Sequence, residues 1–305
     1  MYNLQIRNRT LFWKRSFSYA FRSFSFSGGT DMDIHSTVTL NNGVEIPRLG
    51  LGVFMMSDGE ETESAVRTAL EVGYRHIDTA KAYGNEASVG KAIRESGIPR
   101  EDIFVTTKLW NAAMREGNEE EEFYASLRRL GFDYVDLYLI HWPVKEAYVR
   151  AWSIMEKLYD KGLIRAIGVS NFNPHHMETL ERSATITPAA NQIELHPFLT
   201  QDTVCAYFRG KGIALESWSP LGRGALLNDP VIARIADRLN RTPAQVILRW
   251  HLQQDFIVFP KSVRRDRIIE NAALFDFSLD EKQMTEINAL NRNERFGADP
   301  DTFTF

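Results

Sequence analysis

The chain is poor in cysteine, and Cys205 is the only one among its 305 residues. A single cysteine excludes an internal disulfide bond and a metal centre built from cysteine thiolates. No apolar run approaches the ~18 residues that a membrane-spanning helix needs. Basic residues are not in excess, because 36 Lys and Arg stand against 40 Asp and Glu, for a net charge of −4. We therefore expect neither nucleic acid nor a membrane among its partners.

Several motifs that bind nucleotides or metals, or present a nucleophile, are also missing. The Gly-x-Gly segments at 50–52 and 222–224 lack the third glycine of G-x-G-x-x-G, so a Rossmann domain is disfavoured. There is no Walker loop and no H-E-x-x-H zinc motif. In the segment 168–172, Phe172 stands where the nucleophile elbow of a serine hydrolase needs glycine. We expect no bound metal.

The first 30 residues differ in composition from the rest of the chain. They contain no Asp or Glu, and their Ser and Phe are interleaved with the basic residues Arg7, Arg9, Lys14, Arg15 and Arg22. This composition is typical of a mitochondrial transit peptide. The alternative, which we favour, is a non-structural leader, for example an upstream start codon read in place of Met32, with the protein in the cytoplasm. In both cases we expect residues 1–31 to lie outside the fold and residues 32–305 to form one domain.

From Val38 onward, short apolar runs alternate with amphipathic segments. Residues 38–40 and 44–46 flank an Asn-Gly turn and predict a β-hairpin. Strands are predicted at 49–54, 75–78, 103–108, 135–141, 165–170, 190–194, 214–217 and 256–260. Helices are predicted at 60–71, 86–95, 119–130, 147–160, 174–183, 200–211, 230–239 and 243–253. Eight strands interleaved with helices predict an α/β protein, a closed (β/α)8 TIM barrel preceded by a hairpin.

Ionisable side chains stand at the ends of the early predicted strands. Asp78, Lys108 and His141 each fall at a strand end, and Tyr83 lies in the loop after Asp78. Because the carboxyl ends of barrel strands meet at one face, we expect the four groups to converge there. Each has an ordinary structural alternative, such as a capping aspartate or a core histidine. Four together at neighbouring strand ends indicate a catalytic site.

The chemistry of these four groups suits protonation of a carbonyl oxygen. A phenol has an ordinary pKa of about 10, and a neighbouring ammonium is expected to lower the pKa of Tyr83. A carboxylate paired with Lys108 holds that ammonium in place, and His141 orients the substrate oxygen. The carbonyl carbon must then receive a hydride. No side chain supplies one, so a cofactor is required.

Three spaced motifs run through the predicted domain. The first is G-Y-R-H-I-D-T-A at 73–80, followed by Tyr83, Glu86 and Gly90; the second is I-G-V-S-N-F at 167–172; the third is P-K-S at 260–262, followed by Arg267, Glu270, Asn271 and Leu274. Together they resemble the motifs of the aldo-keto reductase superfamily, and the resemblance extends from about Val38 to the C-terminus. Three motifs in the right order are far more specific than any one of them. Phe259 departs from the aliphatic residue that is usual in the family.

The resemblance implies site residues and NADPH as the cofactor. It places Asp78, Tyr83, Lys108 and His141 on the family's catalytic tetrad. The positions implied to contact the cofactor are Gly52, Val53, Phe54, Asp78, Ser170, Asn171, Gln192, Trp218, Ser219, Leu221, Lys261, Ser262, Val263, Arg267, Glu270 and Asn271.

The implied contacts divide among the parts of the cofactor. Ser170, Asn171 and Gln192 would bind the nicotinamide carboxamide, and Trp218 would stack on the ring. The 2′-phosphate would meet Lys261, Ser262 and Arg267. Because Val53-Phe54 stands where the family often has Thr-Trp, a hydroxyl contact to the cofactor is expected to be absent.

The substrate class follows from the short segments after His141 and after Leu290. These resemble the diketogluconate-reductase and prostaglandin-F-synthase-like branch of the family, and they imply an open site. The residues expected to contact substrate are Phe54, Tyr83, Trp110, His141 and Trp142. The resulting prediction is a monomeric, NADPH-dependent reductase of small aldehydes, dicarbonyls and keto-sugars.

Two other functions fit the same residues. One is a nucleotide-sensing regulatory subunit with the same fold. The other is a phosphate-binding barrel isomerase or lyase, in which Tyr83 and Lys108 would abstract a proton without a nicotinamide.

Overall fold

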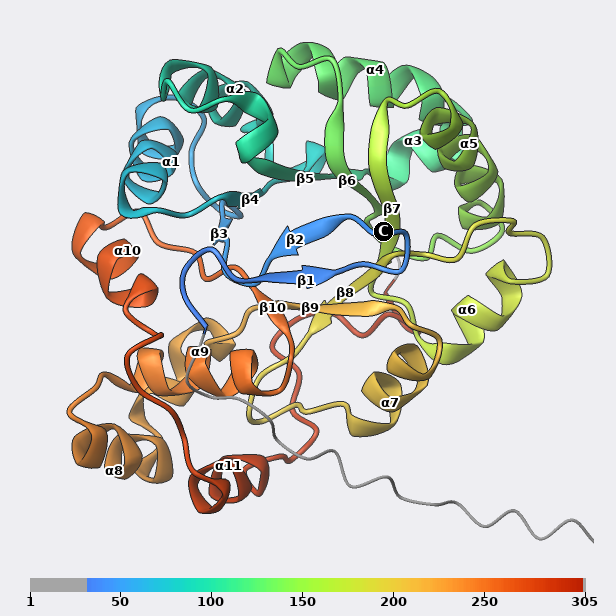
Figure 1. Ribbon diagram of the computed structural model, residues 1–305. Helices are drawn as coiled ribbons and strands as arrows, with labels where there is room; N and C mark the ends of the chain where they lie inside the picture. Colours follow the sequence, from blue (N-terminus) through green and yellow to red (C-terminus); the bar gives the residue numbers. More distant parts are fainter. Residues whose placement is uncertain (1–31, 304–305) are drawn as a thin grey trace, which may run out of the picture.

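The computed structural model describes residues 32–303, and their centre is a ring of parallel strands (Figure 1). In chain order these are β3 (Leu51–Gly52), β4 (His76–Asp78), β5 (Phe104–Leu109), β6 (Val135–Ile140), β7 (Ile164–Ser170), β8 (Ala190–Glu194), β9 (Ala214–Trp218) and β10 (Ile257–Val258), each paired with the next. The ring closes where Gly50 N donates a hydrogen bond of 2.9 Å to Val258 O and Leu49 bridges Val258 in parallel. The predicted (β/α)8 barrel is therefore confirmed.

Helices cover the outside of the ring, and every predicted helical segment contains one (Figure 1). They are α1 (Glu60–Val72), α2 (Glu86–Glu95), α4 (Glu119–Leu130), α5 (Tyr148–Asp160), α6 (Pro174–Leu180), α7 (Asp202–Gly210), α8 (Pro230–Leu239) and α9 (Pro243–Gln253). Three further α-helices between residues 32 and 303 are absent from the prediction: α3 (Asn111–Glu116), α10 (Arg265–Ala272) and α11 (Glu281–Asn288). None of the helices between residues 32 and 303 is long and apolar enough to cross a membrane.

Local sequence explains where several helices begin. The Asp229 side chain accepts hydrogen bonds from the first turn of α8, and Thr242 accepts one of 3.3 Å from Gln245 N at the start of α9. Both helices carry proline in their first turn, where its missing N–H costs no hydrogen bond. The unpredicted α11 has the same kind of start, because Asp280 Oδ1 accepts a 2.7 Å hydrogen bond from Gln283 N.

The hairpin of β1 (Thr37–Thr39) and β2 (Glu45–Pro47) closes one end of the barrel (Figure 1). Leu40 and Ile46 are buried against inward-facing strand residues such as Leu139. Two turn side chains bind the barrel, since Asn41 Nδ2 donates to Pro188 O and Asn42 Nδ2 donates to Arg165 O, both at 2.9 Å. These carbonyls precede or begin β8 and β7, so the hairpin covers the amino ends of the strands.

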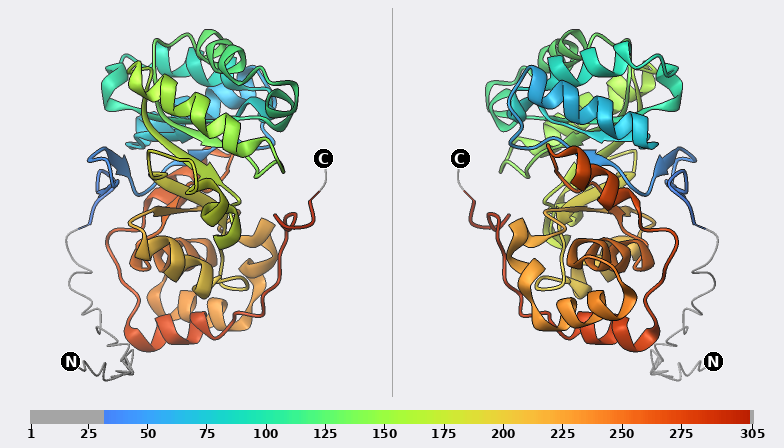
Figure 2. Two further views of the ribbon diagram at one scale, coloured as in Figure 1. Left: turned by 90° about the vertical axis from the view of Figure 1, so that its right-hand side faces the viewer. Right: turned by 90° about the vertical axis from the view of Figure 1, so that its left-hand side faces the viewer.

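The opposite end of the barrel holds the chemistry-bearing residues. Figure 2 shows the hairpin at one end and the C-terminal tail at the other, beside the carboxyl ends of the strands. Because the two ends are separated by the packed barrel interior, the hairpin contributes to stability and takes no part in the candidate site.

Gly90 is expected to be essential for packing α2 against α4. A Cβ atom at this position would lie 1.9 Å from the carbonyl oxygen of Leu130. We expect Gly90→Ala to lower the free energy of unfolding by about 1–3 kcal/mol, since neither backbone can move freely. The helical Gly210, whose Cβ would meet nothing within 4 Å, is the matched control. Gly210→Ala should leave stability unchanged or raised, and equal effects in urea unfolding would contradict the packing argument.

Candidate active site

Four ionisable side chains meet at the carboxyl end of the barrel. Asp78 ends β4, Lys108 lies in β5, Tyr83 ends the short 3-10 helix η1 (Lys81–Tyr83), and His141 follows β6. Lys108 Nζ donates to Asp78 Oδ1 at 2.7 Å, to Asp78 Oδ2 at 2.9 Å and to Tyr83 OH at 3.3 Å. The Tyr83 and His141 rings are 5.8 Å apart in an edge-on arrangement. The structure thus brings together the four residues that the resemblance places on the tetrad.

Burial sets the charge states of this tetrad. Burial alone would lower the pKa of Lys108, but Asp78 and Tyr83 outweigh it, so the net pKa is above its ordinary value. Burial raises the pKa of Tyr83, and the ammonium offsets only part of that rise. Lys108 thus lowers the pKa of Tyr83 as expected, but burial raises it by more, so the net pKa lies above its ordinary value. Burial, and then Lys108, hold the pKa of His141 well below its usual range. Near neutral pH, Tyr83 is thus a protonated phenol and His141 a neutral imidazole.

A second layer of polar side chains lies behind the tetrad. Gln192 Nε2 donates to Asp78 Oδ2 at 2.9 Å and to Glu216 Oε2 at 3.1 Å. Glu216 is fully buried, and burial, followed by the charge of Asp78, raises its pKa to about 8. Glu216 is not among the site residues predicted from the sequence. The signal that could have identified it is an acidic residue inside the short strand predicted at 214–217, next to a barrel interior that is otherwise expected to be uncharged.

The same layer fixes residues implied to bind nicotinamide. Asn171 Nδ2 donates to His141 O at 3.0 Å, and Trp218 Nε1 donates to Asn171 Oδ1 at 2.9 Å. Ser170 Oγ donates to Gln192 O at 2.9 Å. Asn171 has a left-handed backbone with φ of 63°, and so does Ser219 with φ of 51°. Such strained non-glycine residues concentrate at functional sites.

These groups open into a cavity of about 570 Å³. Its lining includes the tetrad members Asp78, Tyr83 and His141, the expected aromatic walls Phe54, Trp110 and Trp142, and the implied cofactor positions Gly52, Ser170, Asn171, Gln192, Trp218, Ser219 and Lys261. The lining also includes five residues that were not among the implied cofactor or substrate contacts: Arg223, Phe259, Gly297, Ala298 and Phe303. The tail therefore forms part of the wall, and the site is less open than its short loops imply.

A buried carboxylate holds this tail in place. Glu194 Oε1 accepts hydrogen bonds from Phe296 N at 2.7 Å and from Gly297 N at 3.1 Å. A Cβ at Gly297 would lie 2.2 Å from the Trp218 ring, so the tail backbone passes directly over that ring.

The cavity suits a nicotinamide ring. It combines a flat aromatic side chain, Trp218, with amide and hydroxyl groups of Ser170, Asn171 and Gln192 beside the tetrad. His141 Nδ1 is buried without a hydrogen-bond partner among residues 32–303. Val53 does not fit its implied role, because its side chain is fully buried in the hydrophobic core and does not line the cavity.

Of the residues implied to meet the adenosine part, Lys261 lines the cavity, and the others lie outside it, most of them around the start of α10. Arg264 pairs with Asp266, and Arg265 pairs with Glu71 at 2.8 Å. Arg267 is exposed and has no ion-pair partner within the described part of the chain. The basic segment therefore holds a cation that the fold itself does not neutralise, which suits an anionic ligand.

The other implied adenosine contacts are distributed along the same segment. Ser262 is buried and accepts a 3.2 Å hydrogen bond from Arg264 N, whereas Val263 is exposed. Glu270 accepts a 2.8 Å hydrogen bond from Thr242. Asn271 is buried in α10, and Leu221 lies half-buried before the 3-10 helix η3 (Gly222–Asn228).

Known proteins resemble this chain along nearly its whole described length. The model of the aldo/keto reductase family matches residues 48–292. Glyoxal reductase of Bacillus subtilis is 50% identical over 272 residues, which cover 89% of this chain and 99% of that protein. The 9,11-endoperoxide prostaglandin H2 reductase of Trypanosoma cruzi is 48% identical over 272 residues, which cover 88% and 96%.

Solved structures resemble the fold of this chain as well. A point mutant of Gox0644 in complex with NADPH superimposes with a TM-score of 0.85 at 39% identity, covering 89% of this chain and 99% of that one. Since both the family model and these relatives span most of the chain, it belongs to the aldo/keto reductase family, as its three sequence motifs predict.

Proposed function

We propose that this chain reduces small aldehydes and ketones to alcohols with NADPH, dicarbonyls and keto-sugars included. The observation that carries the proposal is the contact of Lys108 Nζ with both Asp78 and Tyr83 OH at the base of the cavity. Two comparisons support the substrate and cofactor class: a relative acts as a glyoxal reductase, and a structural neighbour was solved with NADPH.

The proposed mechanism assigns one task to each tetrad residue. Bound NADPH would supply the hydride that reaches the carbonyl carbon. Tyr83 OH donates a proton to the carbonyl oxygen as that oxygen gains negative charge. Lys108 stabilises the phenolate that remains, and Asp78 keeps the ammonium in place. His141, as a neutral imidazole, hydrogen-bonds the substrate oxygen and orients it.

The walls of the cavity support a preference for compact substrates. Phe54 lies 5.0 Å from Tyr83, and Trp110 lies 5.1 Å from His141, measured between ring centroids. Aromatic rings on both sides of the tetrad leave room for a small carbonyl compound beside the cofactor. We further propose that residues 32–305 act as one domain and a monomer in the cytoplasm; residues 1–31 lie outside the described residues.

Tyr83→Phe should reduce turnover of a test aldehyde such as glyoxal by about 10²–10⁴-fold, because it removes the proton donor and leaves the ring. The Kd for NADPH should change little. Tyr124→Phe, which removes a hydroxyl on α4 away from the cavity, is the control and should keep full activity. Near-normal turnover by Tyr83→Phe would refute the tetrad assignment and leave open the regulatory and isomerase alternatives.

Arg267→Ala should weaken NADPH binding by about ten- to a hundredfold, because one charge-assisted contact to the 2′-phosphate is lost. NADH lacks this phosphate, so its Kd should be nearly unchanged. Arg265→Ala is the matched control, since Arg265 is also exposed on α10 but pairs with Glu71. Both Kd values can be measured by quenching of tryptophan fluorescence. Equal losses for the two coenzymes would make Arg267 a structural residue.

Glu216→Gln should change how stability depends on pH. The unfolded carboxyl has a pKa near 4.5 and the folded one about 8, so between these values the folded state holds a proton that the unfolded state has released. Wild-type stability from this group therefore falls as pH rises from about 4.5 to 8. The variant has no such proton, so its stability relative to wild type should rise over that range. Urea unfolding at pH 5.5, 7 and 8 measures the difference, and parallel pH curves would contradict a neutral Glu216.

A further inference from the structure

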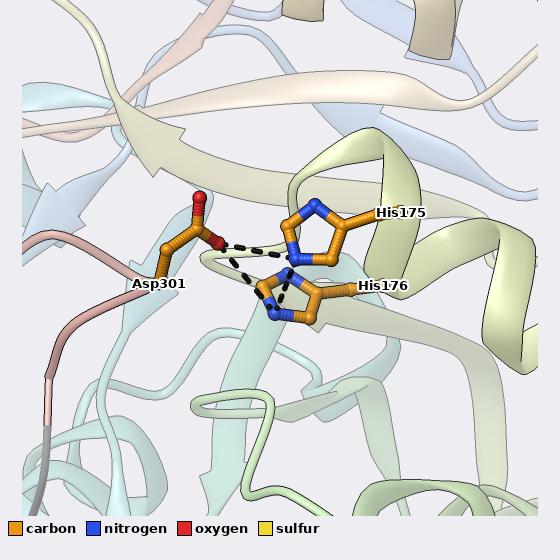
Figure 3. Close-up of side chains that lie close together, drawn as sticks. All are labelled: His175, His176 and Asp301. Atoms are coloured by element: carbon orange, nitrogen blue, oxygen red, sulfur yellow. Dashed lines mark hydrogen bonds and ion pairs between the residues drawn. The ribbon is translucent and has the colours of Figure 1, made fainter.

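A second cluster of ligand-type side chains lies beside the C-terminal tail, outside the tetrad (Figure 3). His175 and His176 lie in the first turn of α6, and Asp301 lies in the tail. His175 Nε2 is 3.1 Å from His176 Nε2 and 3.2 Å from Asp301 Oδ1, and His176 Nε2 is 3.7 Å from the same oxygen. Three potential ligand atoms thus form a compact triangle.

Near neutral pH, no placement of protons makes all three contacts between these ligand atoms favourable. His176 Nδ1 accepts a 3.1 Å hydrogen bond from Asn173 N, so the neutral ring carries its proton on Nε2. With His175 Nε2 unprotonated, that nitrogen and the Asp301 carboxylate are two acceptors facing each other. With His175 Nε2 protonated, two N–H groups face each other instead. While the Asn173 hydrogen bond stays in place, one of the three contacts is always repulsive.

A single cation satisfies all three contacts at once. A point equidistant from the three atoms lies about 1.9 Å from each, close to the 2.0–2.1 Å of Zn–N bonds. We propose that His175, His176 and Asp301 form a binding site for a divalent transition-metal ion of the Zn²⁺ class, which would fasten the C-terminal tail to α6. Two imidazoles and a carboxylate are a common ligand set for such ions. The single cysteine and the missing H-E-x-x-H motif predict no metal, and no local motif reveals this cluster, because Asp301 follows His176 by 125 residues.

Neighbouring groups support ligand orientation and set the affinity. Asn173 Nδ2 donates a 2.8 Å hydrogen bond to Asp301 Oδ1, which holds the carboxylate toward the histidines. Coordination through Nε2 of His176 moves the ring proton to Nδ1, and the hydrogen bond from Asn173 N is then lost. Because the site has only three protein ligands and binding costs this hydrogen bond, we expect a Kd for the ion in the micromolar range.

The position of the cluster links it to the catalytic cavity. Phe303, two residues after Asp301, packs on Trp142 with ring centroids 4.6 Å apart. Trp142 and Phe303 line the catalytic cavity, and they also line a neighbouring cavity of about 740 Å³ that contains His175, His176 and Asp301. An ion on the three ligands would therefore hold the tail segment that forms the wall between the two cavities.

Metal titration of the untagged, chelator-treated full chain tests the site. Calorimetry with Zn²⁺, and the visible absorption of Co²⁺, should reveal one ion per chain with micromolar Kd. His175→Asn and Asp301→Asn should each weaken binding at least tenfold, the second while keeping an acceptor for Asn173. His35→Asn removes an exposed histidine elsewhere and is the control, which should bind normally.

Two results would overturn the proposed ion-binding site, and a third would overturn the fastening of the tail. One is the absence of stoichiometric binding at micromolar Zn²⁺; the other is binding that Asp301→Asn leaves unchanged. Amide hydrogen exchange of residues 297–303 should slow at least severalfold on adding Zn²⁺, and unchanged exchange in a chain that binds the ion would refute the fastening of the tail. None of these measurements needs turnover, so they stand or fall independently of the proposed reductase activity.

Discussion

One buried ammonium organises the catalytic end of this barrel. Lys108 is fully buried, and an unpaired cation at that depth would cost on the order of several kcal/mol. Its Nζ is satisfied by both oxygens of Asp78, by Thr79 O at 2.9 Å and by Tyr83 OH. These partners come from β4 and from the two segments that follow it. The contacts that make the buried charge tolerable therefore also fix the position of the phenol that donates the proton.

Charge balance extends from this pair into the barrel interior. One cation faces two carboxyl groups, Asp78 and Glu216, which Gln192 links through its amide. A neutral Glu216 leaves one positive and one negative charge, which is the arrangement that a low-dielectric interior tolerates best. The Gln192 side chain also lines the cavity. This one residue therefore both links the buried carboxyl groups and offers a polar group to a ligand.

The pattern along the chain was sufficient to predict the barrel, because short apolar runs that are buried on both faces alternate with helices that bury one face, and this alternation recurs eight times. The tetrad could also be predicted, since Asp78, Lys108 and His141 end strands whose carboxyl ends must meet. Two kinds of feature could not be predicted from the sequence. The direction of the Tyr83 pKa shift depends on burial depth, which no local pattern encodes. The tail after Arg295 has no periodic pattern, and its course depends on Glu194, about a hundred residues away in sequence.

The hydrogen bonds that hold the tail fix the position of its backbone without fixing the identity of its side chains. Glu194 binds main-chain amides of Phe296 and Gly297, and every residue except proline offers such an amide. Gly297 is restricted in size, because a Cβ there would lie 2.2 Å from the Trp218 ring. The hydrogen bonds of Glu194 therefore do not depend on which side chains stand at positions such as Ala298 and Phe303. In evolution, a chain built this way can acquire new substrates through changes in a few terminal residues, while the barrel and its buried charges remain untouched.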